Sequence, residues 1–300
     1  MEREHTAERV LAPPRRYDRL RRRLRTVHLE LRHNPNMMLG IFIVLLVCSI
    51  AIFAPVIANK DPRELHVFDR LQAPSTQSYL GTDGMGRDVY ARVIYGSRIS
   101  LQVGAMVALL SMTFGVAIGV VTGYYRMLDN IVMRIADGLM AFPSFLLAIA
   151  LVTVLGASLG TVVTAMVVVE IPVLVRLVRA SVLSIREREY IEAARAIGAR
   201  PIRILGRHVF PNLVAPILVQ GTFVFALAML GEAGLSFLGA GIPPDTPSWG
   251  NMMGEGKLFF RLAVWIMFFP GLMLSVTILG VNLVGDGLRD ALDPRLRRAR

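Results

Sequence analysis

Six mostly apolar runs divide the chain, and polar or charged segments separate them. A helix needs roughly 20 apolar residues to cross the ~30 Å hydrocarbon core of a membrane. An isolated strand would leave its backbone groups unsatisfied in lipid. We therefore expect an all-α membrane bundle of six transmembrane helices. The expected spans are residues 38–58, 99–123, 139–156, 159–175, 213–231 and 262–284.

The segments between these runs predict four regions. They are a basic cytoplasmic tail (1–37), the first transmembrane helix with its outer loop (38–98), a five-helix core (99–295) that holds a large cytoplasmic loop (176–212), and a short C-terminal tail (296–300).

In the basic tail, apolar residues recur at spacings of 3, 4, 3 and 4, with arginines between them. This spacing predicts an amphipathic helix on an anionic inner leaflet; the alternative is a disordered basic tail. The apolar positions are Tyr17, Leu20, Leu24, Val27 and Leu31.

Composition and charge support a membrane protein and indicate its orientation. The chain is 54% hydrophobic and 18% charged, whereas soluble domains carry about 25% charged residues. The net charge of +11 does not indicate nucleic-acid binding, because 25 of the 33 Lys and Arg residues lie in alternate segments, counted from the N-terminus. Positive charge collects on the cytoplasmic side, so both termini are expected there.

No catalytic constellation is found in the sequence. The single cysteine, Cys48, lies in an apolar run, and no Cys/His pattern predicts a metal site. Residues 81–88 resemble a phosphate loop but lack its Lys-Ser/Thr ending, and neither Lys60 nor Lys257 ends such a loop. Any ATP hydrolysis is therefore expected on another polypeptide. A stand-alone channel or secondary transporter and a membrane-embedded enzyme remain as alternatives.

Glu170 is the one charged residue inside the six runs. A carboxylate at that depth is costly, so it either contacts substrate or gates a path, or it pairs with a nearby arginine such as Arg176. Proline kinks helices, so prolines in the runs indicate a translocation path or ordinary bundle packing. They are Pro143, Pro172, Pro216 and Pro270, and Phe142 and Pro143 join Glu170 as path candidates.

The loop 176–212 predicts a helical hairpin. Residues 187–197 form a polar helix, Gly198 is placed to end it, and Pro201 is suited to begin a second helix. Ala193 and Ala194 would let another protein approach the backbone, and Glu192 supplies a charge for pairing. From these residues alone, a solvated hairpin is equally compatible.

This loop resembles the coupling loop of permease subunits of ABC importers. The matching pattern is Glu-Ala-Ala, three residues, Gly, and a Pro thirteen residues later. Here it is formed by Glu192, Ala193, Ala194, Gly198 and Pro211, with Arg195 in the same helix. Shorter segments resemble the C-type permease of the oligopeptide, dipeptide and nickel branch. They include Gly81-Thr82-Asp83, Gly86-Arg87-Asp88, Ala141-Phe142-Pro143-Ser144 and Pro247-Ser248-Trp249-Gly250-Asn251.

The resemblance implies a type I importer permease with cytoplasmic coupling helices and no cofactor of its own. Implied partners are a homologous second permease, two ABC ATPase subunits that bind ATP and Mg²⁺, an extracytoplasmic substrate-binding protein and membrane lipid. Trp249, Asp83 and Arg87, in the two outward segments, are the candidate binding-protein contacts. The alternatives are that the segment with Trp249 packs on its own bundle and that residues 81–88 are a turn-rich structural segment. Peptides are the expected substrate; nickel, glutathione, haem or another small solute is the alternative.

Overall fold

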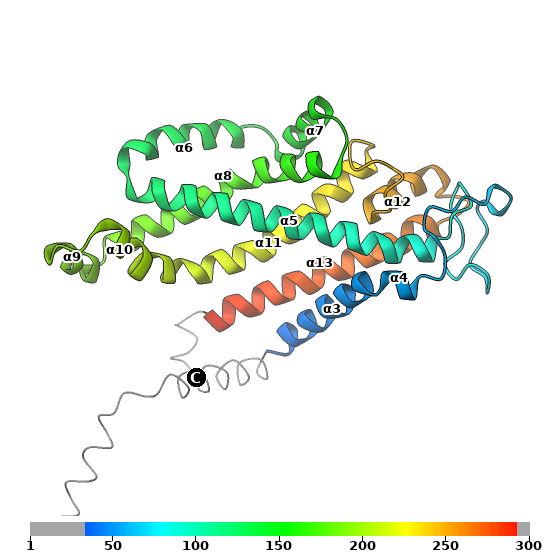
Figure 1. Cartoon of the computed structure of the whole chain (residues 1–300), viewed down its shortest axis with the longest axis horizontal. Helices are drawn as coiled ribbons and strands as arrows, with labels where there is room; N and C mark the ends of the chain where they lie inside the picture. The colour runs from blue at the N-terminus through cyan, green and yellow to red at the C-terminus, as the bar shows by residue number, and fades with distance from the viewer. Residues whose placement is uncertain (1–33, 293–300) are drawn as a thin grey trace, which may run out of the picture.

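A computed structural model of the chain describes residues 34–292, and these residues form an α-helical bundle with no strand (Figure 1). The expectations for the tails 1–33 and 293–300, including the amphipathic helix, lie outside the described residues. The elements are α3 (Pro35–Ile52), α4 (Ala54–Ile57), η1 (Val67–Asp69), α5 (Val89–Tyr124), α6 (Arg126–Met140), α7 (Ser144–Leu155), α8 (Leu159–Arg186), α9 (Glu189–Ala196), α10 (Pro201–Ile204), η2 (Leu205–Val209), α11 (Phe210–Phe237), α12 (Trp249–Gly256), η3 (Lys257–Phe259) and α13 (Trp265–Leu292).

Five helical stretches are long and apolar enough to cross a membrane, which confirms five of the six expected spans as helices. They are α3, α5, α8, the stretch from α10 to α11, and α13. Several extend beyond the apolar runs. Helix α5 begins at Val89, ten residues before the expected span, because Asp88 caps it by accepting the amide N–H of Ala91 at 2.9 Å. The boundary expected between residues 98 and 99 therefore falls inside a helix.

The remaining expected span, residues 139–156, is not one continuous helix, so this prediction is wrong. Helices α6 and α7 meet there at 89°. Pro143 stands at the break, and the residue before a proline is driven out of the helical region. Helix α7 has 12 residues, which corresponds to about 18 Å, so it is too short to cross ~30 Å of hydrocarbon. Pro172, Pro216 and Pro270, in contrast, lie inside continuous helices.

Helices α5 and α8 run in parallel and approach closely along a row of glycines. A Cβ added at Gly115, Gly119 or Gly123 would lie 2.6–2.7 Å from a side chain of α8. The α8 side chains are Leu174, Val178 and Val182. Small residues four positions apart allow membrane helices to pack backbone to backbone. The Gly-x-x-x-Gly repeat is present in the sequence, but the spans were predicted from the apolar runs, which do not show which helices pack together.

Helix α6 is attached to α8 by ion pairs. Asp129 pairs with Arg179, and the Arg176 Nη2 donates to Asp137 Oδ1 at 2.5 Å. Toward the outside, α6 exposes the apolar side chains of Met127, Ile131 and Ile135.

The bundle has two distinct ends, and the broken pair α6 and α7 covers one side of it (Figure 1). Helices α9 and α10 project at one end, which we call the hairpin end. Helix α12 and the segment 58–88 form the other, which we call the α12 end.

Replacing Gly119 with leucine is expected to destabilise the protein by about 1–3 kcal/mol, because the new side chain would overlap Val178. The midpoint of thermal unfolding in detergent measures this. Gly138→Leu is the matched control, since a Cβ there meets nothing within 4 Å. Equal midpoints for the two variants would contradict the close packing of α5 and α8.

Candidate functional site

The hairpin at the end of α8 has the local structure expected from its sequence. Helix α9 ends before Gly198, which has a φ of +79°. Such a conformation suits glycine because a Cβ would clash with the backbone. Pro201 stands in the first turn of α10. The two-helix hairpin predicted for this loop is therefore confirmed.

A small apolar core joins this hairpin to the membrane helices. Ile191 of α9 and Ile204 of α10 are fully buried against the ends of α8 and α11. The other members of this core are Val178, Val182, Ile185, Val209, Leu213 and Ile217. Helix α10 also continues without a gap through the π-helical turn η2 into α11. Hence the expected loop 176–212 is largely an extension of α8 and α11.

The surface of the hairpin differs in two ways from the sequence expectation. Glu192, Ala193, Arg195, Gly198 and Pro211 are exposed, as a docking surface requires. Ala194 is 9% exposed and packs inward, so only Ala193 of the pair offers a close approach to a partner. The second difference is an apolar tip formed by Ile197 and Ile202, which are 86% and 77% exposed on either side of Gly198. Exposed apolar groups of this kind mark interaction sites.

Arg186 connects the hairpin end of α8 to α5. Its Nη1 donates to the carbonyl oxygens of Gly123 and Tyr124 at 3.1 and 3.4 Å. These carbonyls lie in the last turn of α5 and lack partners within that helix. Movement of α8 at this end is therefore coupled to α5.

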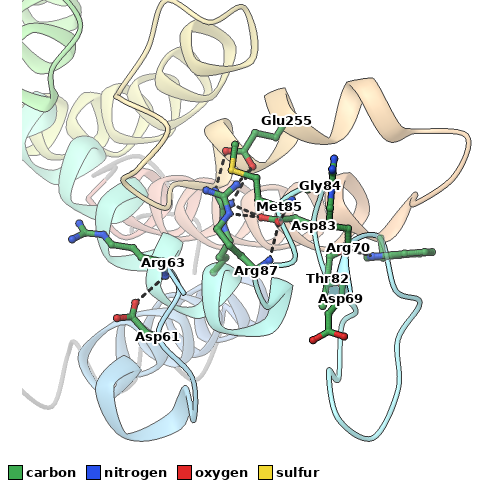
Figure 2. Close-up of polar contacts among 12 residues, drawn as sticks. Asp61, Arg63, Asp69, Arg70, Thr82, Asp83, Gly84, Met85, Arg87 and Glu255 are labelled. Atoms are coloured by element: carbon green, nitrogen blue, oxygen red, sulfur yellow. Dashed lines mark hydrogen bonds and ion pairs between the residues drawn. The ribbon is translucent and has the colours of Figure 1, made fainter. Parts of the chain in front are cut away.

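At the α12 end, three buried charged side chains and the partly exposed Glu255 form a network. Asp83 Oδ2 accepts from Arg87 Nε at 2.7 Å and from Arg92 Nη1 at 2.5 Å. Glu255 of α12 accepts from Arg87 at 2.5 Å and from Arg92 at 3.0 and 3.1 Å. In Figure 2 the side chains of Asp83 and Glu255 converge on that of Arg87. Two cations and two anions balance, which is the condition for burying charge.

The binding-protein contacts expected at Asp83, Arg87 and Trp249 are not supported, because none of these residues presents a surface. Asp83 and Arg87 are 1% and 5% exposed, and Trp249 is 0% exposed. Trp249 Nε1 donates to the carbonyl oxygen of Val93 at 2.9 Å. These residues tie α12 and the segment 81–88 to α5. The exposed apolar residues at this end include Phe68 in η1, Leu258 in η3 and Leu262 in the loop that follows η3.

Glu170 lies on α8 and is 8% exposed. The pairing with Arg176 that the sequence allows is not formed, because Arg176 pairs with Asp137. Glu170 instead lines a cavity of about 710 Å³. Phe142 and Pro143 are exposed at the break between α6 and α7, and the next residue, Ser144, lines the same cavity.

Replacing Arg92 with methionine is expected to destabilise the protein by about 3–5 kcal/mol, because Asp83 and Glu255 would share one arginine in a buried site. Arg98→Met, on the exposed face of the same helix, is the matched control. Thermal unfolding in detergent and the rate of proteolysis in segment 58–88 report the difference. Unchanged values for Arg92→Met would show that the network does not hold this end together.

Two family descriptions match the sequence. "Binding-protein-dependent transport system inner membrane component" matches residues 78–298. "N-terminal TM domain of oligopeptide transport permease C" matches residues 23–74.

Named relatives are similar along most of their length. One from Sinorhizobium fredii, a "probable peptide ABC transporter permease protein", is 48% identical over 274 residues, which is 91% of this chain and 94% of the relative. A dipeptide transport system permease of Alkalihalophilus pseudofirmus is 43% identical and covers 89% of this chain and 88% of the relative. A glutathione transport system permease of Pectobacterium atrosepticum is 40% identical and covers 89% of each.

The fold is similar to that of a solved structure of the MetNI methionine ABC transporter. The TM-score is 0.56 at 19% sequence identity, over 67% of this chain and 96% of the solved one. The family match covers the helices from α5 to α13, including the hairpin and the cavity. The chain therefore belongs to the family of binding-protein-dependent transport system inner membrane components.

Proposed function

We propose that this chain is a permease subunit of an ATP-driven importer of peptides. With a homologous second permease it forms the translocation path, and an extracytoplasmic binding protein delivers the substrate. Relatives named as peptide, dipeptide and glutathione permeases support this class of substrate. Glutathione, nickel, haem or another small solute is the alternative cargo for the same machinery, and the glutathione relative favours the first of these.

The observation that carries the proposal is the hairpin with its apolar tip. Ile197 and Ile202 are too exposed for a surface that faces only water. Arg195, Arg200 and Arg203 surround this tip, and Glu192 on α9 has no ion-pair partner among the described residues. An apolar knob with a charged rim suits insertion into a groove on a partner protein. That partner is the ATPase subunit, which binds the ATP and Mg²⁺.

The proposed orientation places the hairpin end and both termini in the cytoplasm. The segments that would lie there carry 25 of the 33 Lys and Arg residues. The α12 end then faces outward, where Phe68, Leu258 and Leu262 offer apolar contacts to a binding protein. A polar cavity of about 680 Å³ at this end is lined by Lys60, Arg63 and Arg98 among others.

Introducing aspartate at both Ile197 and Ile202 is expected to abolish co-purification of the ATPase subunits from native membranes, because each carboxylate would enter an apolar groove. Membrane insertion should be unchanged, since both side chains point away from the bundle. Leu258→Asp is the matched control. Its side chain is 76% exposed at the opposite end, so this variant should retain the ATPase subunits.

Normal recovery of ATPase subunits with the double variant would contradict the docking role of the hairpin. Absence of ATPase subunits from the wild-type preparation would contradict the importer function itself.

A further inference from the structure

The cavity that contains Glu170 is formed where four helices and α12 come together. Its lining comes from the first turn of α7, the middle of α8, the last third of α11, the first turns of α13, and Met253 of α12. Its volume of about 710 Å³ lies within the range of roughly 300–1,000 Å³ that is typical of small-molecule sites. Most lining side chains are apolar, including Phe145, Leu230 and Phe237.

Glu170 is the one ionisable side chain among the described lining residues. Its side chain is more than nine-tenths buried, it makes no hydrogen bond or ion pair with any described residue, and its carboxylate oxygens are not among the fully enclosed atoms that lack a partner. Its position, eleven residues into α8, places it about 16 Å from the start of that helix. A carboxylate at such a depth is costly unless it is protonated, paired with a cation or facing a water-filled cavity. Nothing in the described chain supplies the cation, and the cavity that Glu170 lines has room for a ligand that carries one.

The N-terminus of α7 opens on the same cavity. Ser144 and Phe145 line it, and Pro143 in the capping position makes no side-chain hydrogen bond. Within residues 34–292, the first backbone bond at this end runs from Leu147 N–H to Pro143 O at 3.1 Å. The amides of Ser144, Phe145 and Leu146 therefore lack a backbone acceptor. A helix N-terminus carries partial positive charge and attracts anions.

The cavity thus combines a carboxylate, a free helix N-terminus and an apolar wall. This is the complement of a molecule with an ammonium group, a carboxylate and apolar side chains. Interrupted membrane helices whose ends meet charged substrate groups are a known feature of transporters. A single basic side chain from a neighbouring subunit would satisfy Glu170 but would leave the α7 amides and most of the volume unused.

We propose that this cavity is a transient subsite for small zwitterionic peptides during passage, in which Glu170 accepts the N-terminal ammonium group. The amides at the start of α7 receive the peptide carboxylate or a backbone carbonyl. The apolar wall tolerates different side chains, so the subsite selects for a free amino terminus and not for sequence. The inference rests on the proposed peptide function and adds the residue that recognises the amino group.

The test uses the full complex of both permeases, the ATPase subunits and the binding protein, reconstituted in lipid nanodiscs. The probes are two photoreactive dipeptides that carry benzoylphenylalanine at the second position, one with a free amino terminus and one N-acetylated. We expect at least tenfold more cross-linking of the free peptide to this permease. In Glu170→Gln this preference should fall to less than twofold, while the purified complex should retain both permeases and the ATPase subunits.

Two comparisons make the result specific. Asp290→Asn, which removes an exposed carboxylate of α13 outside the cavity, should retain the tenfold preference. Glu170→Asp should restore part of it, since the charge returns on a shorter side chain.

Three results would overturn the proposal. The first is an undiminished preference in Glu170→Gln while the wild-type complex takes up peptide, which would leave the proposed function intact. The second is loss of the second permease from Glu170→Gln preparations, which would assign Glu170 to the subunit interface. The third is a wild-type complex that takes up no peptide, which would overturn the proposed function as well.

Discussion

The satisfaction of backbone hydrogen bonds inside a hydrocarbon layer is the constraint on which the structure depends. It explains why the described chain from Pro35 to Leu292 is mainly helical, with its long irregular segment, 58–88, at the α12 end, and it is consistent with the close packing of α5 on α8 along a row of glycines. The break between α6 and α7 frees three amide groups at the start of α7. Such groups are tolerated at membrane depth only inside protein or beside a water-filled cavity, and here they open on the Glu170 cavity.

The same constraint connects the two functional regions. Helices α8 and α11 both run from the hairpin core to the Glu170 cavity without interruption, apart from the π-helical turn η2 at the start of α11. Ile191 and Ile204 hold α9 and α10 against these helices. In the proposed mechanism, a force on the hairpin would be transmitted along these two continuous helices to the cavity walls. At the far end, the Asp83–Arg87–Arg92–Glu255 network holds α12 to α5, so movement is expected between the ends and not within the α12 end.

The hairpin and five of the six spans could be predicted from the sequence, because short stretches of neighbouring residues determine them. Gly198 and Pro201 determine backbone geometry by themselves, and apolar runs locate helices that lipid requires. The sequence could not show which residues of the hairpin and the outer segments are exposed to a partner. Ala194 and Trp249 are residue types that are common at protein contacts, yet tertiary packing buries them. Ile197 and Ile202 are residue types that are common in cores, yet they are exposed at the tip. The break at Pro143 was readable in principle, but the continuous hydropathy of residues 139–156 concealed it.

In the proposed mechanism, the nucleotide state of the ATPase subunits changes the Glu170 cavity through the hairpin. Ser275 lies exposed in that cavity, and the one native cysteine, Cys48, can be replaced by serine. The measurement is the rate at which a membrane-impermeant thiol reagent modifies Ser275→Cys in the full complex, without nucleotide and with ATP held by a hydrolysis-deficient ATPase. We expect the modification rate to differ at least fivefold between the two nucleotide states. Equal rates in both states would contradict coupling of the cavity to the nucleotide state.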